Sequence, residues 1–227
     1  MKQITANSRK QLILENLKKT GGIKISELAG KFGKSRMTIT RDLDELASNG
    51  LLLRVHGGAV SNISRGYEPP YFSRKGLRTV AKQAIANMAN ELITEGNTLI
   101  LDVGSTTREL AQFLKKRKNL TVITPSLEHA MELAGNSVIK LIVTGSIVRV
   151  GEMSIIDPIS ENNIKEFNVD KSYIDVGKID LDVSLTEYNA EDAQVKKSII
   201  GNCKESIILA NSRKLGNVTF SKVIRLE

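Results

Sequence analysis

The sequence predicts an α/β protein of two domains, a small, mostly helical one over residues 1–60 and a larger one over residues 77–227. Three observations lead to this prediction. Near the amino terminus, short amphipathic helices are followed by a glycine-rich hairpin. Residues 61–76 contain two prolines, two glycines and no periodicity, which indicates a linker or an extended arm. Beyond Glu95, apolar strands alternate with helices, which is typical of a mostly parallel sheet.

Three helices are predicted in the first domain. The first begins near Ser8 and ends before Gly21. The second is expected to begin at Ser26, whose hydroxyl can accept a backbone N–H of the first turn, and Ser35 is expected to cap the third in the same way. Each helix carries an apolar face that we expect in one core: Leu12, Ile13 and Leu17; then Leu28, Ala29 and Phe32; then Ile39, Leu43 and Leu46.

The third helix carries arginines and hydroxyls opposite its apolar face, and a strand over Leu51–Val55 with a turn at His56-Gly57-Gly58 follows it. Charged helix faces are usually only solvated. The order of the parts, however, favours a DNA-binding winged helix-turn-helix whose third helix enters the major groove. The residues expected to contact DNA are Ser35, Arg36, Thr38, Thr40 and Arg41 in the helix and Arg54 and His56 in the wing.

The distribution of charge agrees with this prediction. Residues 1–64 hold 11 Lys or Arg against 5 Asp or Glu, a net charge of +6, and the remainder holds 22 against 20, a net charge of +2. The sequence contains no run of about 18 apolar residues, the length needed to span a bilayer. Its amino terminus also has no apolar signal region. The single cysteine, Cys203, excludes an internal disulfide and fits a reducing compartment. We therefore expect a cytoplasmic protein without a membrane partner.

The second domain is expected to begin with a helix over Thr79–Ile93 and to continue as alternating strands and helices. The predicted strands are Thr98–Val103, Leu120–Thr124, Val138–Thr144, Lys171–Val176 and Ser206–Ala210. The helices between them run to about Lys116, over Ser126–Ala134 and over Ala190–Asn202. A parallel sheet covered on both faces binds ligands at the carboxyl ends of its strands, where loops lead into helices.

The loop Asp102–Thr107 has the composition of such a ligand site. Gly104 lets the backbone approach a ligand, and the hydroxyls that follow it lie beside the unpaired amides of a helix amino terminus, which together suit a phosphate. A well-capped helix without a ligand explains the same residues about equally well. Thr124-Pro125-Ser126 and Thr144-Gly145-Ser146 end two further strands with hydroxyls or glycine, and this favours a pocket. Lys214 could supply a cation, or could be a solvated loop lysine.

The segment SELAGKFGKSRMTITRDLDELASNGLLLRVHGGA resembles the winged helix-turn-helix of the DeoR family of bacterial transcriptional regulators, and the resemblance extends over nearly the whole chain. The segments DVGSTT, VITPS, VTG, KSYIDVGKID, NAEDAQVKKSII and ILANSRKLG resemble, in order, its sensor domain, whose fold is related to ribose 5-phosphate isomerase and which commonly binds phosphorylated sugars. The resemblance implies that the effector is surrounded by Asp102, Gly104, Ser105, Thr106, Thr107, Thr124, Ser126, Gly145, Lys196 and Lys214.

The predicted function is therefore sequence-specific regulation of transcription, as a repressor of sugar-metabolism genes controlled by a phosphorylated sugar or similar small anion. One winged helix reads few base pairs, so a homo-oligomer, a dimer or a tetramer, is expected on double-stranded operator DNA. Residues 61–76 are the expected place where domain orientation changes. No cofactor or metal is expected, since the two histidines, His56 and His129, have no ligand-like spacing.

Two other classes of protein are weighed against this function. The first is a sugar-phosphate isomerase or deaminase with an added DNA-binding module, in which Asp102 or Asp175 would act as the base. The sequence shows no paired acidic motif of the kind such isomerases use, and kinship of fold does not transfer activity. The second is a nonspecific packaging protein, which would not prefer its own promoter over random DNA.

Overall fold

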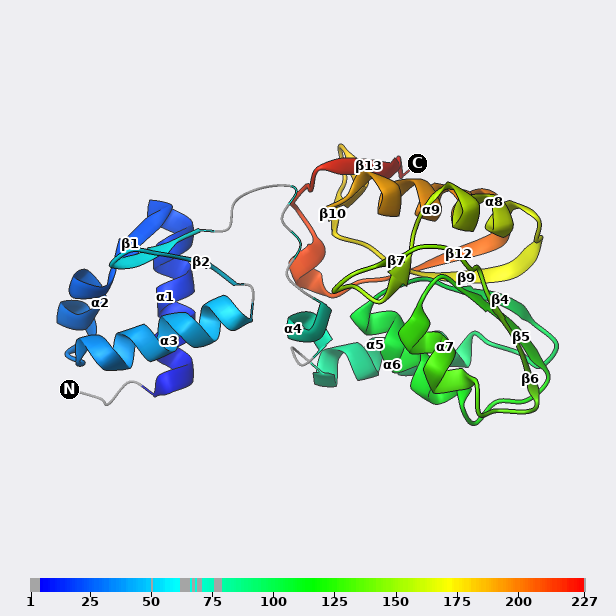
Figure 1. The fold of residues 1–227 in the computed structure, drawn as a ribbon, viewed down its shortest axis with the longest axis horizontal. Helices are drawn as coiled ribbons and strands as arrows, with labels where there is room; N and C mark the ends of the chain where they lie inside the picture. The colour runs from blue at the N-terminus through cyan, green and yellow to red at the C-terminus, as the bar shows by residue number, and fades with distance from the viewer. Residues whose placement is uncertain are drawn as a thin grey trace. The chain divides into compact units, whose positions relative to one another are not determined.

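The computed structural model describes residues 5–49, 51–61, 66, 68, 71–75 and 79–226. The chain divides into two compact units, Met1–Arg74 and Lys75–Glu227, and each is described by itself (Figure 1). This boundary lies close to the predicted start of the second domain at residue 77. The predicted linker contains a short helix, α4 (Tyr71–Lys75). Most of the remaining linker residues lie outside the described part of the chain.

The first unit is a three-helix domain with a small antiparallel sheet. Its helices are α1 (Ala6–Thr20), α2 (Ile25–Phe32) and α3 (Arg36–Ser48), and its strands are β1 (Gly22–Lys24), β2 (Leu53–Val55) and β3 (Gly58–Val60). The strand order is β1-β3-β2. The core consists of apolar residues from all three helices and from the sheet: Ile13, Leu17, Ile23, Leu28, Ile39, Leu43, Leu46, Leu52 and Ala59. The winged helix-turn-helix architecture is thereby confirmed.

Local details of this unit differ from the sequence prediction. Helix α1 begins at Ala6, two residues before the predicted start near Ser8, because Thr5 caps it. The prediction that Ser26 caps α2 was wrong: Lys24 occupies the cap position, and the Ile25 amide donates to the Gly57 carbonyl oxygen at 2.9 Å. The helix therefore starts directly at the end of β1, a strand that the sequence prediction missed. Leu12 is 39% exposed and does not join the core.

The second unit is built on a five-stranded sheet in which every neighbouring pair is parallel, in the order β12-β9-β4-β5-β6. The strands are β4 (Thr98–Leu101), β5 (Leu120–Thr124), β6 (Ile139–Val143), β9 (Val169–Asp175) and β12 (Cys203–Leu209). All five were predicted, with ends that shift by up to three residues. The predicted mostly parallel α/β domain is thereby confirmed.

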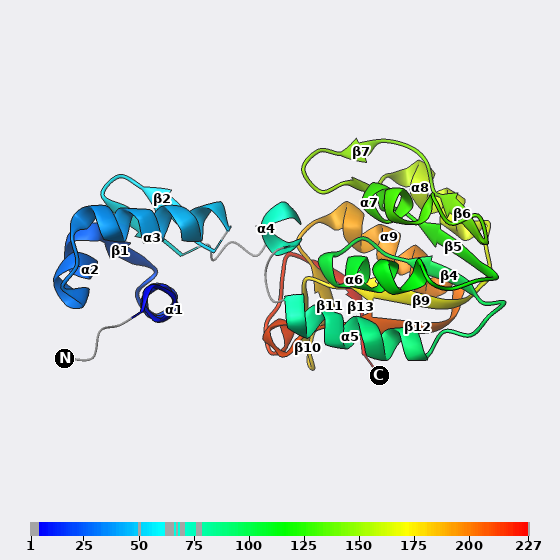
Figure 2. The same cartoon turned by 90° about the horizontal axis from the view of Figure 1, so that it is seen from below.

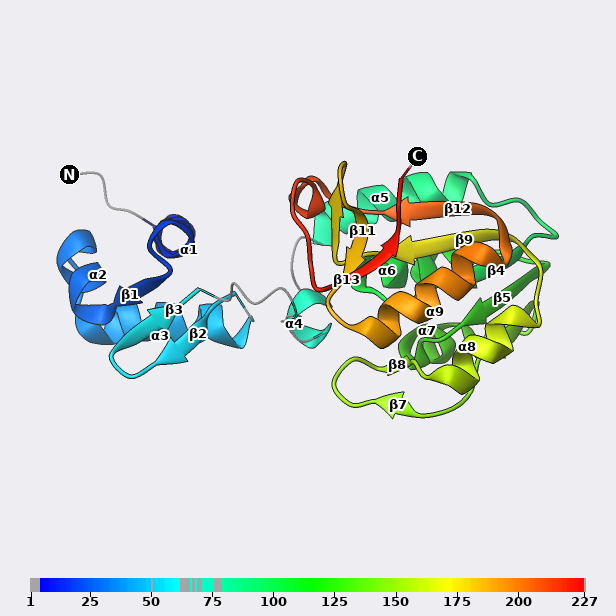
Figure 3. The same cartoon turned by 90° about the horizontal axis from the view of Figure 1, so that it is seen from above.

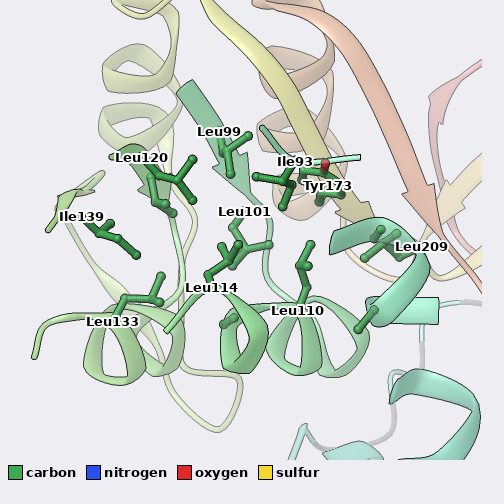
Figure 4. Close-up of a cluster of buried hydrophobic side chains, with 14 residues drawn as sticks. Ile93, Leu99, Leu101, Leu110, Leu114, Leu120, Leu133, Ile139, Tyr173 and Leu209 are labelled. Carbon is green, nitrogen blue, oxygen red and sulfur yellow. The ribbon is translucent and has the colours of Figure 1, made fainter. Parts of the chain in front are cut away.

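Helices cover both faces of this sheet. Helices α5 (Thr79–Glu91), α6 (Ser105–Leu114) and α7 (Leu127–Leu133) lie on one face (Figure 2), and α8 (Pro158–Lys165) and α9 (Ala190–Gly201) lie on the other (Figure 3). Successive strand residues point to opposite faces, so Leu99 and Leu101 enter the core under α5 and α6 (Figure 4), whereas Ile100 enters the core under α8 and α9. The sheet is therefore packed between two apolar cores, one on each face.

Several short elements escaped the sequence prediction. They are the sheet of β10 (Lys178–Asp180), β11 (Ser184–Glu187) and β13 (Ser221–Ile224), the hairpin of β7 (Val148–Arg149) and β8 (Ser154–Ile155), and the 3-10 helix η1 (Ser212–Lys214). Strands of two to four residues are too short to show a period. Helix α8 also escaped, although Asp157 caps it and Pro158 opens it, which is a recognisable signal for a helix start.

Candidate functional site

Helix α3 is held with its polar face outward. The Thr38 amide donates to the Ser35 hydroxyl at 3.1 Å, so the predicted cap is present. Ile39 and Leu43 are fully buried against the other helices. The predicted DNA-binding residues Arg36 and Arg41 are consequently exposed, and Thr38 and Thr40 are half-buried.

The exposed face of α3 is free to meet another molecule. Within the described residues, the side chains of Arg36 and Arg41 make no hydrogen bond and no ion pair. Met37 is 68% exposed on the same helix, beside these arginines in the first turn. An exposed apolar side chain there can contact a thymine methyl group in the major groove. The sequence prediction did not include Met37 among the DNA contacts.

The wing is built by the residues of the RVHGGA segment. Gly57 has a φ of +75°, and a Cβ at Gly58 would collide with the Ile23 carbonyl group, so both positions require glycine. Arg54 donates from Nε to Asp44 at 2.8 Å and also to the Gly58 carbonyl oxygen. Arg54 thus ties the wing to α3, while the predicted contact residue His56 is exposed at the tip.

A buried ion pair that the sequence prediction missed orients α3. Arg9 of α1 donates to Asp42 from Nε at 2.5 Å and from Nη2 at 3.0 Å, and both side chains are only 7% exposed. A guanidinium that grips a carboxylate with two parallel hydrogen bonds fixes direction as well as distance. Because Asp42 follows Arg41, this pair sets the rotation of the reading face relative to α1.

In the second unit, three predicted or suspected polar residues gather at the carboxyl ends of adjacent strands. Asp102 follows β4, Thr124 ends β5 and Asp175 ends β9, and β4 lies between the other two in the sheet. All three are almost completely buried. The parallel topology therefore brings together residues from distant parts of the chain, as the sequence predicted.

Lys196 of α9 is the cation at the centre of this group. Its Nζ donates to Asp102 Oδ2 at 2.5 Å and to the Asp175 carbonyl oxygen at 2.8 Å, and it lies 3.5 Å from Glu187 Oε2. Burial raises the pKa of Asp102 to about 6, although Lys196 opposes this shift. Burial by itself would lower the pKa of Lys196, but Asp102, Glu187 and Asp192 outweigh it and hold the ammonium protonated.

Lys214 and Gly104 both meet Asp175. Lys214 forms an ion pair with the Asp175 carboxylate and donates to the Val176 carbonyl oxygen, so it is not a solvated loop lysine. A Cβ at Gly104 would collide with the same carboxylate, which explains the glycine at this position. Counting Asp102, Asp175 and Glu187 against Lys196 and Lys214, three carboxylates face two ammonium groups, a net charge of −1.

The start of α6 supplies unpaired backbone donors. Its cap residue Gly104 has no side chain, and within the described residues the amides of Ser105, Thr106 and Thr107 have no hydrogen-bond acceptor. The Thr107 hydroxyl donates to the Gly104 carbonyl oxygen at 3.0 Å and does not cap the helix. This arrangement counts against the alternative of a well-capped helix. It leaves three N–H groups at the positive end of a helix dipole.

The hydroxyls of Thr124 and Ser126 are occupied within the fold. Thr124 donates to the Leu101 carbonyl oxygen at 2.7 Å, and Ser126 accepts the His129 amide as the cap of α7. The His129 ring is fully buried, and its Nε2 lies 3.4 Å from the Gly104 carbonyl oxygen. Burial lowers the pKa of His129 to about 4. His129 therefore ties this strand end to the Gly104 loop, a role not apparent from spacing.

Gly145, another predicted effector residue, is not brought into this cluster by any contact among the described residues. It is exposed, with a φ of +67°, and begins the loop that leads into β7. Glu187 was not predicted because it lies on the short strand β11, where the Gly177 amide donates to it at 3.1 Å. A lone glutamate in a short strand gives no sequence signal.

The two units thus define a class of protein, a DNA-binding regulator with a separate sensor domain. The chain belongs to the DeoR family: residues 9–65 match the family model of the DeoR-like helix-turn-helix domain, and residues 78–227 match that of the DeoR C terminal sensor domain. This match decides between the regulator and the enzyme in favour of the regulator.

Curated relatives agree with the family. The chain is 32% identical to a transcriptional regulator named YulB from Bacillus subtilis, covering 96% of this chain and 84% of YulB. It is 33% identical to the glycerol-3-phosphate regulon repressor of Escherichia coli, covering 90% of this chain and 81% of that repressor. Among solved structures it is similar to ribose 5-phosphate isomerase from Methanocaldococcus jannaschii, with 19% identity and a TM-score of 0.45, covering 60% of this chain and 54% of the isomerase.

Within the described residues, no helix is both long and apolar enough to cross a bilayer. They also contain no group of three or more His, Cys, Asp or Glu side chains that could hold a metal ion.

Proposed function

We propose that this regulator is a repressor whose effector is a phosphorylated sugar or sugar-like compound, bound at the carboxyl ends of β4, β5 and β9. The observation that carries the proposal is the start of α6, where Gly104 is followed by three amides without an acceptor among the described residues. Such a helix start accepts a phosphate. A relative named for the glycerol-3-phosphate regulon supports an effector of this chemistry.

The sugar part of the effector would meet the buried charges. Asp102 and Asp175 are hydrogen-bond acceptors for sugar hydroxyls, and Lys196 and Lys214 are donors. Since both lysines are already paired with carboxylates, the phosphate depends on the helix amides and on any cation that can change partner. Thr124, Ser126 and Gly145 would shape the edge of the site.

At the other unit, α3 would enter the major groove of operator DNA. The residues of α3 that would contact bases or phosphates are Arg36, Thr38, Thr40 and Arg41. Ser35, at the start of the helix, would lie beside the DNA backbone. His56 at the tip of the wing would contact a phosphate. Arg54 would reach DNA only by leaving Asp44, so its first role is to hold the wing.

An effector controls DNA binding only if it binds the DNA-competent and DNA-incompetent arrangements with different affinity. Two copies or more of the chain, bridging repeated half-sites, would provide such arrangements, because one recognition helix reads too few base pairs. Residues 61–76 are the segment where the orientation of the DNA-binding domain would change. We expect this to take place in the cytoplasm, where the operator DNA lies.

The test is a titration of a fluorescent fragment of the gene's own promoter, with and without glycerol 3-phosphate, fructose 1-phosphate and glucosamine 6-phosphate. We expect specific binding that at least one of these compounds changes several-fold. Lys214→Gln should abolish the response without changing DNA affinity in its absence. Lys140→Gln, at an exposed position on β6, is the matched control. Equal binding to random DNA, or no response to any sugar phosphate, would count against the proposal.

A further inference from the structure

The hairpin of β7 and β8 follows β6 and is attached through β8 to the loop after β5. The Leu127 amide donates to the Met153 carbonyl oxygen at 2.9 Å, and the Ile155 amide donates to the Pro125 carbonyl oxygen at 2.7 Å. A bridge between Ser126 and Ser154 joins the same segments. Strand β8 therefore lies along the loop after β5, beside the proposed effector site.

The other strand of the hairpin, β7, reaches α9. Arg149 Nη1 lies 2.6 Å from Asp192 Oδ2, and Asp192 is in the first turn of α9, four residues before Lys196. Residues i and i+4 of a helix share a face, and Lys196 is the residue that holds Asp102. The hairpin thus connects the two elements that flank the Asp102–Lys196 ion pair, the loop after β5 and the helix α9.

The backbone and the surface of the hairpin are unusual. Ser146, just before the hairpin, and Met153, in its turn, have φ values of +126° and +56°, a region that side-chain-bearing residues rarely adopt. Such conformations cluster at ligand clamps and switch regions. Ile147 and Val150, on either side of the strand residue Arg149, are 72% and 95% exposed. An apolar surface of this kind on a short hairpin is suited to closing over a ligand.

Of Lys196, Lys214 and Arg149, Arg149 has the most exposed side chain. The Lys196 side chain is 6% exposed and pairs with Asp102 and Glu187, and the Lys214 side chain is 20% exposed. The Arg149 side chain is 31% exposed. Asp192 lies in the first turn of α9, where the helix dipole stabilises its negative charge even without the guanidinium.

We propose that Arg149 is a ligand of the effector phosphate and exchanges Asp192 for it when the effector binds, so that the β7–β8 hairpin closes over the site. This inference rests on the proposed function, because it assumes a phosphate at the start of α6. The planar guanidinium can grip two phosphate oxygens at once, which an ammonium group cannot. The exchange also brings a guanidinium to a site where three carboxylates already face two ammonium groups.

The test measures the binding of glycerol 3-phosphate and of inorganic phosphate to the full chain by isothermal titration calorimetry. Arg149→Gln should weaken binding of glycerol 3-phosphate by about tenfold or more, the loss expected for a hydrogen bond to a charged group. Arg149→Lys should lie between Arg149→Gln and the parent. Asp192→Asn should strengthen binding several-fold, because it removes the competing carboxylate. Lys140→Gln should bind like the parent.

The Asp192→Asn variant separates this proposal from a merely structural role. If the Arg149–Asp192 pair only holds the fold, breaking it from either side should weaken binding, and that result would overturn the proposal. Parental affinity in Arg149→Gln would also overturn it and leave the proposed function intact. A parent protein that binds neither compound would overturn this inference, and one that also responds to none of the three sugar phosphates in the promoter titration would overturn the proposed function with it.

A second measurement follows the hairpin itself. Amide hydrogen exchange over residues 146–155 should slow when glycerol 3-phosphate binds the parent protein and should not slow in Arg149→Gln. Unchanged exchange in the ligand-bound parent would overturn the proposed closure.

Discussion

The two functional surfaces of this protein handle charge in opposite ways. On α3, Arg36 and Arg41 are exposed and make no ion pair within the described residues. At the strand ends of the sensor, Lys196 and Lys214 are paired with Asp102 and Asp175, and the carboxylates are almost completely buried. The cations of α3 are exposed to solvent, and the cations of the sensor are bound in ion pairs.

This difference indicates how each surface binds its partner. In the proposed function, helix α3 meets DNA phosphates and bases without breaking an internal interaction, so its affinity should depend on the salt concentration and on the operator sequence. The proposed effector site would have to exchange partners within a buried network, and removing one member of such a pair leaves an uncompensated charge. A ligand that drives such an exchange has the differential affinity that a switch requires.

The largest expected effect concerns the buried Arg9–Asp42 ion pair of the first unit, and it tests whether this pair is as costly to break as the buried pairs of the sensor. Arg9→Met leaves the Asp42 carboxylate buried without a partner, so we expect it to destabilise the first unit by about 3–5 kcal/mol. The measurement is amide hydrogen exchange over α1 and α3 in the full chain.

The matched control for Arg9→Met is the double variant Arg9→Met, Asp42→Leu, which removes both charges and should recover most of the lost stability. If the single and double variants lose the same stability, the pair is not what holds α3 against α1.

A second prediction concerns the acid sensitivity of the sensor. Burial lowers the pKa of His129 from 6.5 to about 4, so the unfolded chain binds a proton more readily than the folded chain between these values. The contribution is fully present above about pH 6.5 and is lost as the pH falls, by about 2 kcal/mol between pH 7 and pH 5. Urea unfolding at the two pH values measures it.

Asp102 changes the stability with pH in the opposite direction to His129, so the control variant must retain Asp102. Its pKa is raised to about 6, so it favours the folded state as the pH falls below that value. A His129→Gln variant retains Asp102 and should lose about 2 kcal/mol less than the parent on acidification. Identical losses in the two proteins would contradict the assignment of a neutral, buried His129.

A third prediction tests the exposed cations directly. Arg41→Ala should weaken operator binding by about 1–3 kcal/mol if Arg41 contacts a base, with no change in the unfolding free energy. Fluorescence anisotropy at fixed salt measures the affinity, and Lys140→Ala in the sensor is the control. Parental affinity in Arg41→Ala would show that the arginine does not contact DNA.

The smallest expected effect concerns the start of the reading helix. Ser35→Ala removes the acceptor of the Thr38 amide and should lower the stability of the first unit by about 1 kcal/mol. Hydrogen exchange in the first turn of α3 should increase, while exchange in α9 should stay the same. An unchanged first turn would mean that water replaces the Ser35 hydroxyl without loss.

The sequence by itself determined the order of the elements and the kind of residue at each strand end. Periodicity, caps and glycines act over a few neighbouring residues, so the three helices, the wing and the five parallel strands could be predicted, as could the gathering of Asp102, Lys196 and Lys214 that the family resemblance implied. Even here, local signals competed: Ser26 has the chemistry of a cap, yet the chain enters α2 at Lys24 because β1 ends there.

Only the tertiary structure decided which charges are paired. Arg9 meets Asp42 across 33 residues, Arg149 meets Asp192 across 43, and Lys196 meets Asp102 across 94. No local pattern encodes such partners, because they are chosen by how helices pack against each other and against the sheet. The same packing buried His129 against the Gly104 loop and left three amides of α6 without an acceptor among the described residues.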